Sequence, residues 1–157
     1  KFLIIAVKMT TTRPIDSAGP QHQCVFDEID HTGDRALRIY GNDLEELLLN
    51  AARGLNSILV SNQISGPLRQ EKFIELEALD MEGLLVDWLS ELAYWAEIEM
   101  LIFHEFKIER VSPNHLRAKI YGTPVNQLTK HIKAVTYHNL EIVRSSTGLT
   151  ATVVFDV

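Results

Sequence analysis

The chain has 157 residues, of which 46% are hydrophobic and 23% are charged, a composition typical of one globular domain. Its 15 Lys and Arg residues are outnumbered by 21 Asp and Glu residues, so the net charge is −6. Nucleic-acid-binding domains usually carry a basic excess that neutralises phosphates, so direct binding of RNA or DNA is disfavoured. A domain of this size builds a sufficient core without disulfides or a structural metal, so we expect any metal site to be functional.

The N-terminal region differs from the rest of the chain. Its apolar run, Phe2–Val7, has six residues, far fewer than the ~20 that a membrane-spanning helix needs. An N-terminal extension or an added strand is a better interpretation of this run than a signal peptide, because no small-residue cleavage site follows cleanly. Residues 10–22 are rich in Thr, Pro, Gly and Ser. We therefore expect residues 1–24 to form an extension or linker ahead of a single domain over residues 25–157.

Cys24 is the single cysteine of the chain. One thiol cannot form an intramolecular disulfide, and no Cys/His spacing typical of a zinc site is present. No stretch of the sequence is apolar enough for a membrane span. These features indicate a protein of a reducing compartment, and we expect a cytoplasmic location with no membrane partner.

Two amphipathic helices are predicted. The first covers about residues 43–60, where apolar residues recur at spacings of three and four, and Asn42 with Glu45 predicts a capping box at its start. The second covers about residues 81–98, with Asp80 as its N-cap. Both patterns are typical of helices that bury one face.

Alternation of apolar and polar residues predicts strands before, between and after the helices. The predicted strands lie near residues 37–39, 74–78, 106–108, 116–120, 140–142 and 151–155. The closing strands are joined by short turns such as Pro113-Asn114, which favours antiparallel pairing. We expect an α+β fold, in which the two helices cover one face of a mostly antiparallel β-sheet.

Three short segments carry polar groups that packing does not require. The first is Asp30-His31-Thr32-Gly33-Asp34, whose two carboxylates are the oxygen ligands that hard cations prefer. Asp, Thr and Gly are equally the residues that form turns by bonding their own backbone. The spacing of these residues favours the turn, and a cation site stays as the alternative interpretation.

The second segment gathers an amine, a phenol and an imidazole at Lys133, Tyr137 and His138. Together with Lys130 and His131 it forms a locally basic region in an acidic protein, which suits a phosphate or an acidic partner. The alternative interpretation is the edge of a strand with solvated polar side chains.

The third segment is Phe155-Asp156-Val157, in which strand alternation directs Phe155 and Asp156 to opposite faces. If Val157 ends the natural chain, its carboxylate lies beside that of Asp156, and such a pair needs a bound cation or a Lys or Arg partner. The sequence offers little support for a freestanding enzyme, because it contains no defensible catalytic triad, no Gly-rich phosphate loop and no HExxH motif.

Taken together, these segments resemble the archease family. The motifs that match are Asp30–Asp34, Gly41–Glu46, Leu84–Leu89, Phe103–Phe106, Ile132–His138 and Phe155–Val157. The match extends from about Val25 to Val157, and its Lys-Ala-Val-Thr-Tyr-His run is highly specific. Gly33 stands where the family commonly has Ala, a departure that should remove no ligand.

The resemblance implies a helper protein rather than an independent enzyme. Archeases act on the RtcB-type RNA ligase of tRNA splicing and RNA repair, speeding its guanylylation and permitting repeated turnover. RNA would then be contacted only through the ligase. Family members bind a divalent cation, usually described as calcium, at positions that match Asp34, Asp156 and Val157. The implied functional patch around this site consists of Asp30, His31, Lys133, Tyr137 and His138.

Two alternatives from other functional classes stay open at the level of sequence. A stand-alone metal-dependent phosphoester hydrolase would turn over its substrate without a ligase. A chaperone-like binding module would instead bind through an exposed apolar patch and would be indifferent to Asp34.

Overall fold

The structure is a computed structural model that describes residues 26–31, 33–62, 64 and 69–157, with the backbone alone described at Asp30 and His31. Its elements, in chain order, are β1 (Phe26–His31), β2 (Asp34–Gly41), α2 (Leu44–Leu59), β3 (Gln70–Glu77), α3 (Met81–Glu99), β4 (Leu101–Ser112), β5 (His115–Pro124), β6 (Ala134–Thr136), β7 (Val143–Ser145) and β8 (Gly148–Asp156). Most of the predicted helices and strands are confirmed by these elements.

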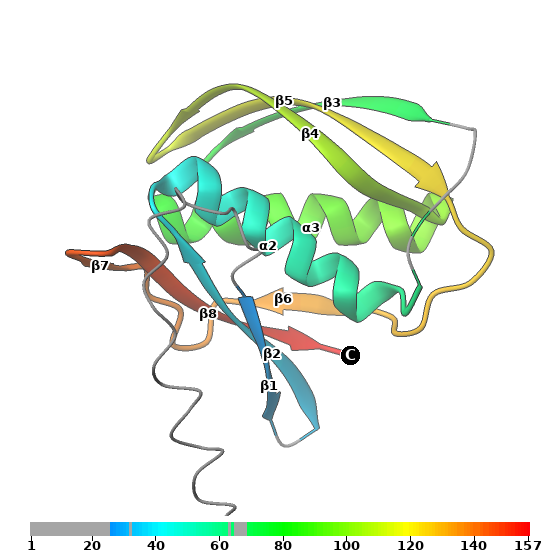
Figure 1. Ribbon diagram of the computed structural model, residues 1–157, viewed down its shortest axis with the longest axis horizontal. Coiled ribbons are helices and arrows are strands. Elements are labelled where there is room, and N and C mark those ends of the chain that lie inside the picture. The colour runs from blue at the N-terminus through cyan, green and yellow to red at the C-terminus, as the bar shows by residue number, and fades with distance from the viewer. Residues whose placement is uncertain (1–25, 32, 63, 65–68) are drawn as a thin grey trace, which may run out of the picture.

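The strands form two antiparallel sheets (Figure 1). The larger sheet has the order β1-β2-β8-β6, with β7 also paired to β8, and the smaller sheet has the order β3-β5-β4. Figure 1 shows α2 and α3 between the two sheets. The predicted α+β class with antiparallel pairing is confirmed. The expected single sheet with helices on one face is replaced by three layers, because a second sheet covers the other side of the helices.

The burial of α3 explains why the helices need a sheet on each side. Leu84, Leu85 and Val86 are consecutive and buried, and Trp88 and Leu89 follow them into the core. Successive helical side chains point about 100° apart, so one face cannot hold all of these residues. A helix that is apolar around most of its circumference must be covered on more than one side.

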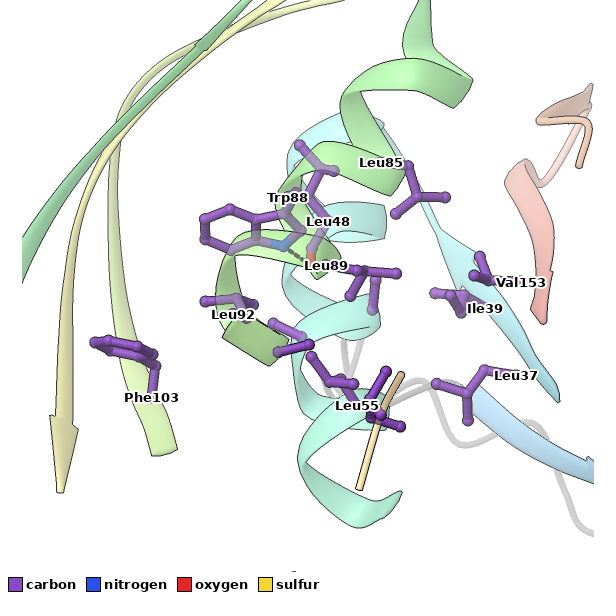
Figure 2. Packing of buried hydrophobic residues seen from close by; sticks show 14 of the residues in the cluster. Leu37, Ile39, Leu48, Leu55, Leu85, Trp88, Leu89, Leu92, Phe103 and Val153 are labelled. Atoms are coloured by element: carbon purple, nitrogen blue, oxygen red, sulfur yellow. Dashed lines mark hydrogen bonds between the residues drawn. The ribbon is translucent and has the colours of Figure 1, made fainter. Parts of the chain in front are cut away.

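Trp88 connects α3 to the second helix and to the smaller sheet. Its indole N–H donates to the carbonyl oxygen of Leu48 in α2 over 2.9 Å. Its ring meets Phe106 of β4 edge-on, with 5.7 Å between the ring centroids. On the other side of α3, Leu85 points toward Ile39 of the larger sheet (Figure 2). One continuous hydrophobic core therefore spans all three layers.

The first residues of α2 and α3 show which side chains cap these helices. The carboxylate of Asp43 accepts from the N–H of Glu46 over 2.9 Å, and the Glu46 carboxylate accepts from the N–H of Asn42 over 2.6 Å. The predicted pair of Asn42 and Glu45 is therefore wrong by one residue, because Asp43 is the last residue with an extended backbone and its side chain reaches the free amides. Asp80 caps α3 as predicted.

Two other segments differ from the prediction. Strand β1 was not predicted, because Phe26 and Ile29 are its only apolar residues and do not alternate. The strand predicted at Leu140 and Ile142 is wrong, since these residues lie in the connection between β6 and β7. Ile142 is buried there, and its N–H donates to the Glu82 carboxylate over 2.9 Å. The alternation of apolar residues at Leu140 and Ile142 arises because the loop between β6 and β7 is anchored to the core, and it does not indicate a strand.

The interpretations of Phe2–Val7, of residues 10–22 and of Cys24 concern residues outside the described part of the chain. Within that part, no helix has both the length and the apolar character that crossing a membrane requires.

Candidate functional site

Neighbouring strands of the larger sheet bring residues of the three predicted segments into one row. The register pairs His31 of β1 with Asp34 of β2, and it pairs Asp156 of β8 with Ala134 of β6. The register between β2 and β8, continued by one residue beyond its last pair, sets Asp34 opposite Asp156. The row therefore runs across four neighbouring strands, from His31 through the two aspartates to Ala134.

Asp34 and Asp156, hereafter the carboxylate pair, point away from the helices. Phe155 is fully buried against the core, so the next residue along β8 faces outward, and Asp156 is exposed. Residues directly opposite in antiparallel strands share a face, with Cβ atoms about 4.5–5.5 Å apart. Among the described residues, no Lys, Arg or His forms an ion pair with either carboxylate. Two facing negative charges therefore stand without an ion-pair partner from the described side chains.

The segment from Asp30 to Asp34 is a tight hairpin. His31 pairs with Asp34, so two residues connect β1 to β2. Gly33 has a φ of 80°, in the left-handed region that glycine adopts without strain. The turn interpretation is confirmed, and it is compatible with a cation site because the turn sets Asp34 at the start of β2. The side chains of Asp30 and His31 are outside the description.

The predicted basic segment is divided by the fold. Strand β6 is an edge strand, as the alternative interpretation predicted. Lys133 lies beside the carboxylate pair, because its N–H donates to the carbonyl oxygen of Asp156 over 2.8 Å. Tyr137 and His138 follow the other end of β6, about 10 Å or more along the strand direction from Ala134. Lys133 is thus brought to the carboxylate pair, and the other two residues are separated from it.

Tyr137 lies over the start of α3. Its hydroxyl is 3.9 Å from the point where a Cβ on Gly83 would stand. Partial burial raises the pKa of the Tyr137 phenol above its ordinary value of 10.0, and the negative charges of Asp87 and Asp80 raise the pKa further. The phenol therefore keeps its proton at neutral pH, which suits a hydrogen-bond donor better than a cation ligand.

Two glutamates of α3 position the segments on either side of β6. The Glu97 carboxylate accepts from the N–H of Ile132 over 3.0 Å and contacts the His131 ring over 2.9 Å. Glu82 likewise accepts from the N–H of Ile142. The sequence did not indicate these roles, because helical periodicity identifies both glutamates only as polar positions far from their partners along the chain.

The donor set at the carboxylate pair fits a hard divalent cation. Calcium takes about six to eight oxygen ligands, and magnesium takes a smaller octahedral set that usually includes water. The pair supplies carboxylate oxygens, and Val157 adds main-chain oxygen next to Asp156. In the described part of the chain, no three His, Cys, Asp or Glu side chains gather into one site. Main-chain oxygens, water or a partner protein would therefore complete the coordination.

These features define a class of small α+β proteins with two helices layered between antiparallel sheets. The solution structure of protein 1598 of Methanobacterium thermoautotrophicum has this fold, with a TM-score of 0.66, 27% identity and coverage of 86% of this chain and 100% of that chain. A crystal structure from Thermotoga maritima, described as an archease and possible chaperone, has a TM-score of 0.57 and 27% identity, covering 87% of this chain and 100% of that chain.

The model of the Archease protein family (MTH1598/TM1083) matches residues 26–157. The protein archease of Methanosarcina barkeri is 36% identical over 141 residues, which cover 84% of this chain and 95% of that relative. The protein archease of Pyrococcus furiosus is 34% identical over 130 residues, covering 78% of this chain and 91% of that relative. The chain belongs to the archease family, which confirms the resemblance; these relatives are named as archeases and not as enzymes.

Proposed function

We propose that this archease activates an RtcB-type RNA ligase by stimulating guanylylation of the ligase, and that it uses a divalent cation, calcium in the first instance, held by Asp34 and Asp156. The observation that carries the metal part is the facing carboxylate pair, which no described basic side chain neutralises. Membership of the archease family supports the choice of partner.

The chemistry of guanylylation indicates what a cation held by the carboxylate pair would do. Negative charge develops on a phosphoryl group during its transfer, and a bound divalent cation supplies charge stabilisation for that group. The chain's own contribution is to hold two carboxylates on one face at a fixed separation. The register that sets this separation is maintained by buried cross-strand pairs such as Leu37 with Val153.

The charge of the protein supports contact with the ligase rather than with RNA. A net charge of −6 disfavours binding to a phosphate backbone. Asp156 is exposed at the end of β8, so the site is open to a partner surface. Lys133 lies next to it and adds one positive charge at the same edge.

Metal binding is tested by titrating calcium into the full chain while following heat release and thermal unfolding. We expect calcium to raise the unfolding temperature of the wild type, and Asp34→Asn and Asp156→Asn to abolish this rise. Without metal, each variant should be more stable than the wild type by about 0.2–1 kcal/mol, because one of two facing like charges is removed. Asp27→Asn, exposed at the opposite end of β1, is the matched control and should behave as the wild type.

Activation is tested by measuring guanylylation of the purified ligase and its number of turnovers, with and without this protein. Wild type should stimulate both, and the two aspartate variants should lose at least tenfold in stimulation. Full stimulation by both variants would contradict the metal site. Hydrolysis of phosphoesters by the protein alone, without any ligase, would favour the hydrolase alternative instead.

A further inference from the structure

An apolar groove runs between α3 and β6. Its volume is about 340 Å³, and the helix contributes Ala93, Tyr94 and Ile98 to one wall while Ile132 and Val135 contribute to the other. Tyr94 and Ile98 are one helical turn apart and remain 54% and 64% exposed. Two large exposed apolar side chains beside a hollow are typical of a surface that binds another molecule.

The strand wall of this groove has a free edge. The N–H of Lys133 points toward β8, since it donates to the carbonyl oxygen of Asp156. Asp156 is therefore turned toward β6, so its register partner Ala134 and, two residues further, Thr136 are turned toward β8, while the N–H of Val135 points away from β8. No other strand in the described part of the chain pairs with this edge of β6. Such an edge can accept a further strand from a partner.

The charge in the groove selects the partner's chemistry. Glu97 is occupied by the N–H of Ile132 and by the His131 ring. Lys133 is exposed and has no ion-pair partner among the described residues. Glu97 keeps its negative charge but is held by these contacts, and Lys133 is the charged side chain of the groove that is left to meet an acidic group of a partner.

The groove is continuous with the carboxylate pair. Ala134 is the cross-strand partner of Asp156. A strand added to β6 would run about 4.8 Å from it, and so about two strand spacings from Asp156. A partner segment bound here would hold the rest of that partner close to the site.

We infer that this groove, the docking groove hereafter, binds an extended segment of the RNA ligase. The segment adds to β6 as a further strand, inserts an apolar side chain beside Tyr94 and Ile98, and sets an acidic side chain against Lys133. Main-chain hydrogen bonds supply affinity in this mode of recognition, and the side-chain pocket supplies specificity. The inference rests on the proposed function and adds to it the surface by which the partner is held.

Calorimetric titration of purified ligase into the full chain tests the apolar wall and the charge separately. We expect the double variant Tyr94→Ser with Ile98→Ser, and the single variant Lys133→Glu, each to raise Kd at least tenfold. These side chains are exposed, so the variants should fold as the wild type. The matched controls are Leu79→Ser, fully exposed about 20 Å away near the start of α3, and Lys107→Glu on the smaller sheet.

The free edge is tested with Val135→Pro. Proline removes the outward N–H of Val135, and Val135→Ala is the control that shortens the same side chain but keeps that N–H. We expect at least a tenfold rise in Kd for the ligase, with circular dichroism confirming that the variant is folded. The exposed side-chain variants test the inference even if this variant fails to fold.

The outcomes separate this inference from the proposed function. The inference would be overturned if the docking-groove variants bound the ligase with wild-type affinity. It would also be overturned if these variants changed only the self-association of this protein, as measured by sedimentation. Asp34→Asn should still bind the ligase through the docking groove but fail to stimulate it. If the wild-type protein neither binds nor stimulates the ligase, the proposed function itself fails.

Discussion

At the scale of single residues, backbone conformation distinguishes two glycines with positive φ. Gly148, at the start of β8, has a φ of 127°, and a Cβ added there would collide with the carbonyl oxygen of Gly41. Left-handed conformations cost an L-residue roughly 1–2 kcal/mol, and the collision adds to this. We expect Gly148→Ala to lower the free energy of unfolding by at least about 2 kcal/mol, measured by urea denaturation.

Gly33→Ala is the control for this prediction. Gly33 also has a positive φ, but nothing lies within 4 Å of its added Cβ. The loss should therefore be about 1 kcal/mol, from backbone strain alone. Equal losses at the two glycines would show that the contact with Gly41 is unimportant.

At the scale of elements, the start of α2 shows which side chain caps the helix. Asp43 accepts from the amide of Glu46, so Asp43→Ala leaves that amide without its partner. We expect a loss of about 1 kcal/mol in unfolding free energy, the usual value of an N-cap. Asn42 provides only its backbone N–H, so Asn42→Ala should change stability by less than about 0.5 kcal/mol. A larger loss at Asn42 would restore the cap expected from the sequence.

The helices and strands also show which elements can be predicted from sequence patterns that are local along the chain. Both helices were predicted within one or two residues, because their periodicity and caps act between residues close in the chain. Strand β1 was missed and a strand at Leu140 was wrongly predicted, because strand pairing depends on partners far along the chain. The short apolar patterns of these segments do not reveal those partners.

At the scale of the whole molecule, Trp88 joins the layers. Trp88→Phe removes the hydrogen bond to Leu48 and leaves unfilled space against the smaller sheet. We expect a loss of about 2–3 kcal/mol in unfolding free energy, with fluorescence of the remaining Trp95 and far-UV circular dichroism changing in one coincident transition.

The corresponding Trp95→Phe variant should lose less, since Trp95 is half-buried and its ring is covered by the Lys72 ammonium at 4.2 Å. Two separate transitions in Trp88→Phe would show that the sheets can unfold independently. That result would contradict a single core spanning both of them.

The candidate site was identified partly from the sequence and partly from the tertiary structure. Asp34 and Asp156 were singled out from local motifs and from the family resemblance, and their use of a metal remains a prediction. The grouping of Tyr137 and His138 with them was implied by the family resemblance, through the segment that also contains Lys133. A strand carries successive residues about 3.3 Å apart in one direction, so a short polar segment need not form one patch.

By itself, the sequence determined the two helices, most strands, the antiparallel α+β class and the family, because these depend on periodicity, capping and local motifs. Only the tertiary structure decided that a second sheet covers the helices and that Asp34 faces Asp156. Both depend on packing between segments distant in the chain, where buried pairs such as Leu37 with Val153 set the register. The same packing leaves β6 at an edge and opens the docking groove beside it.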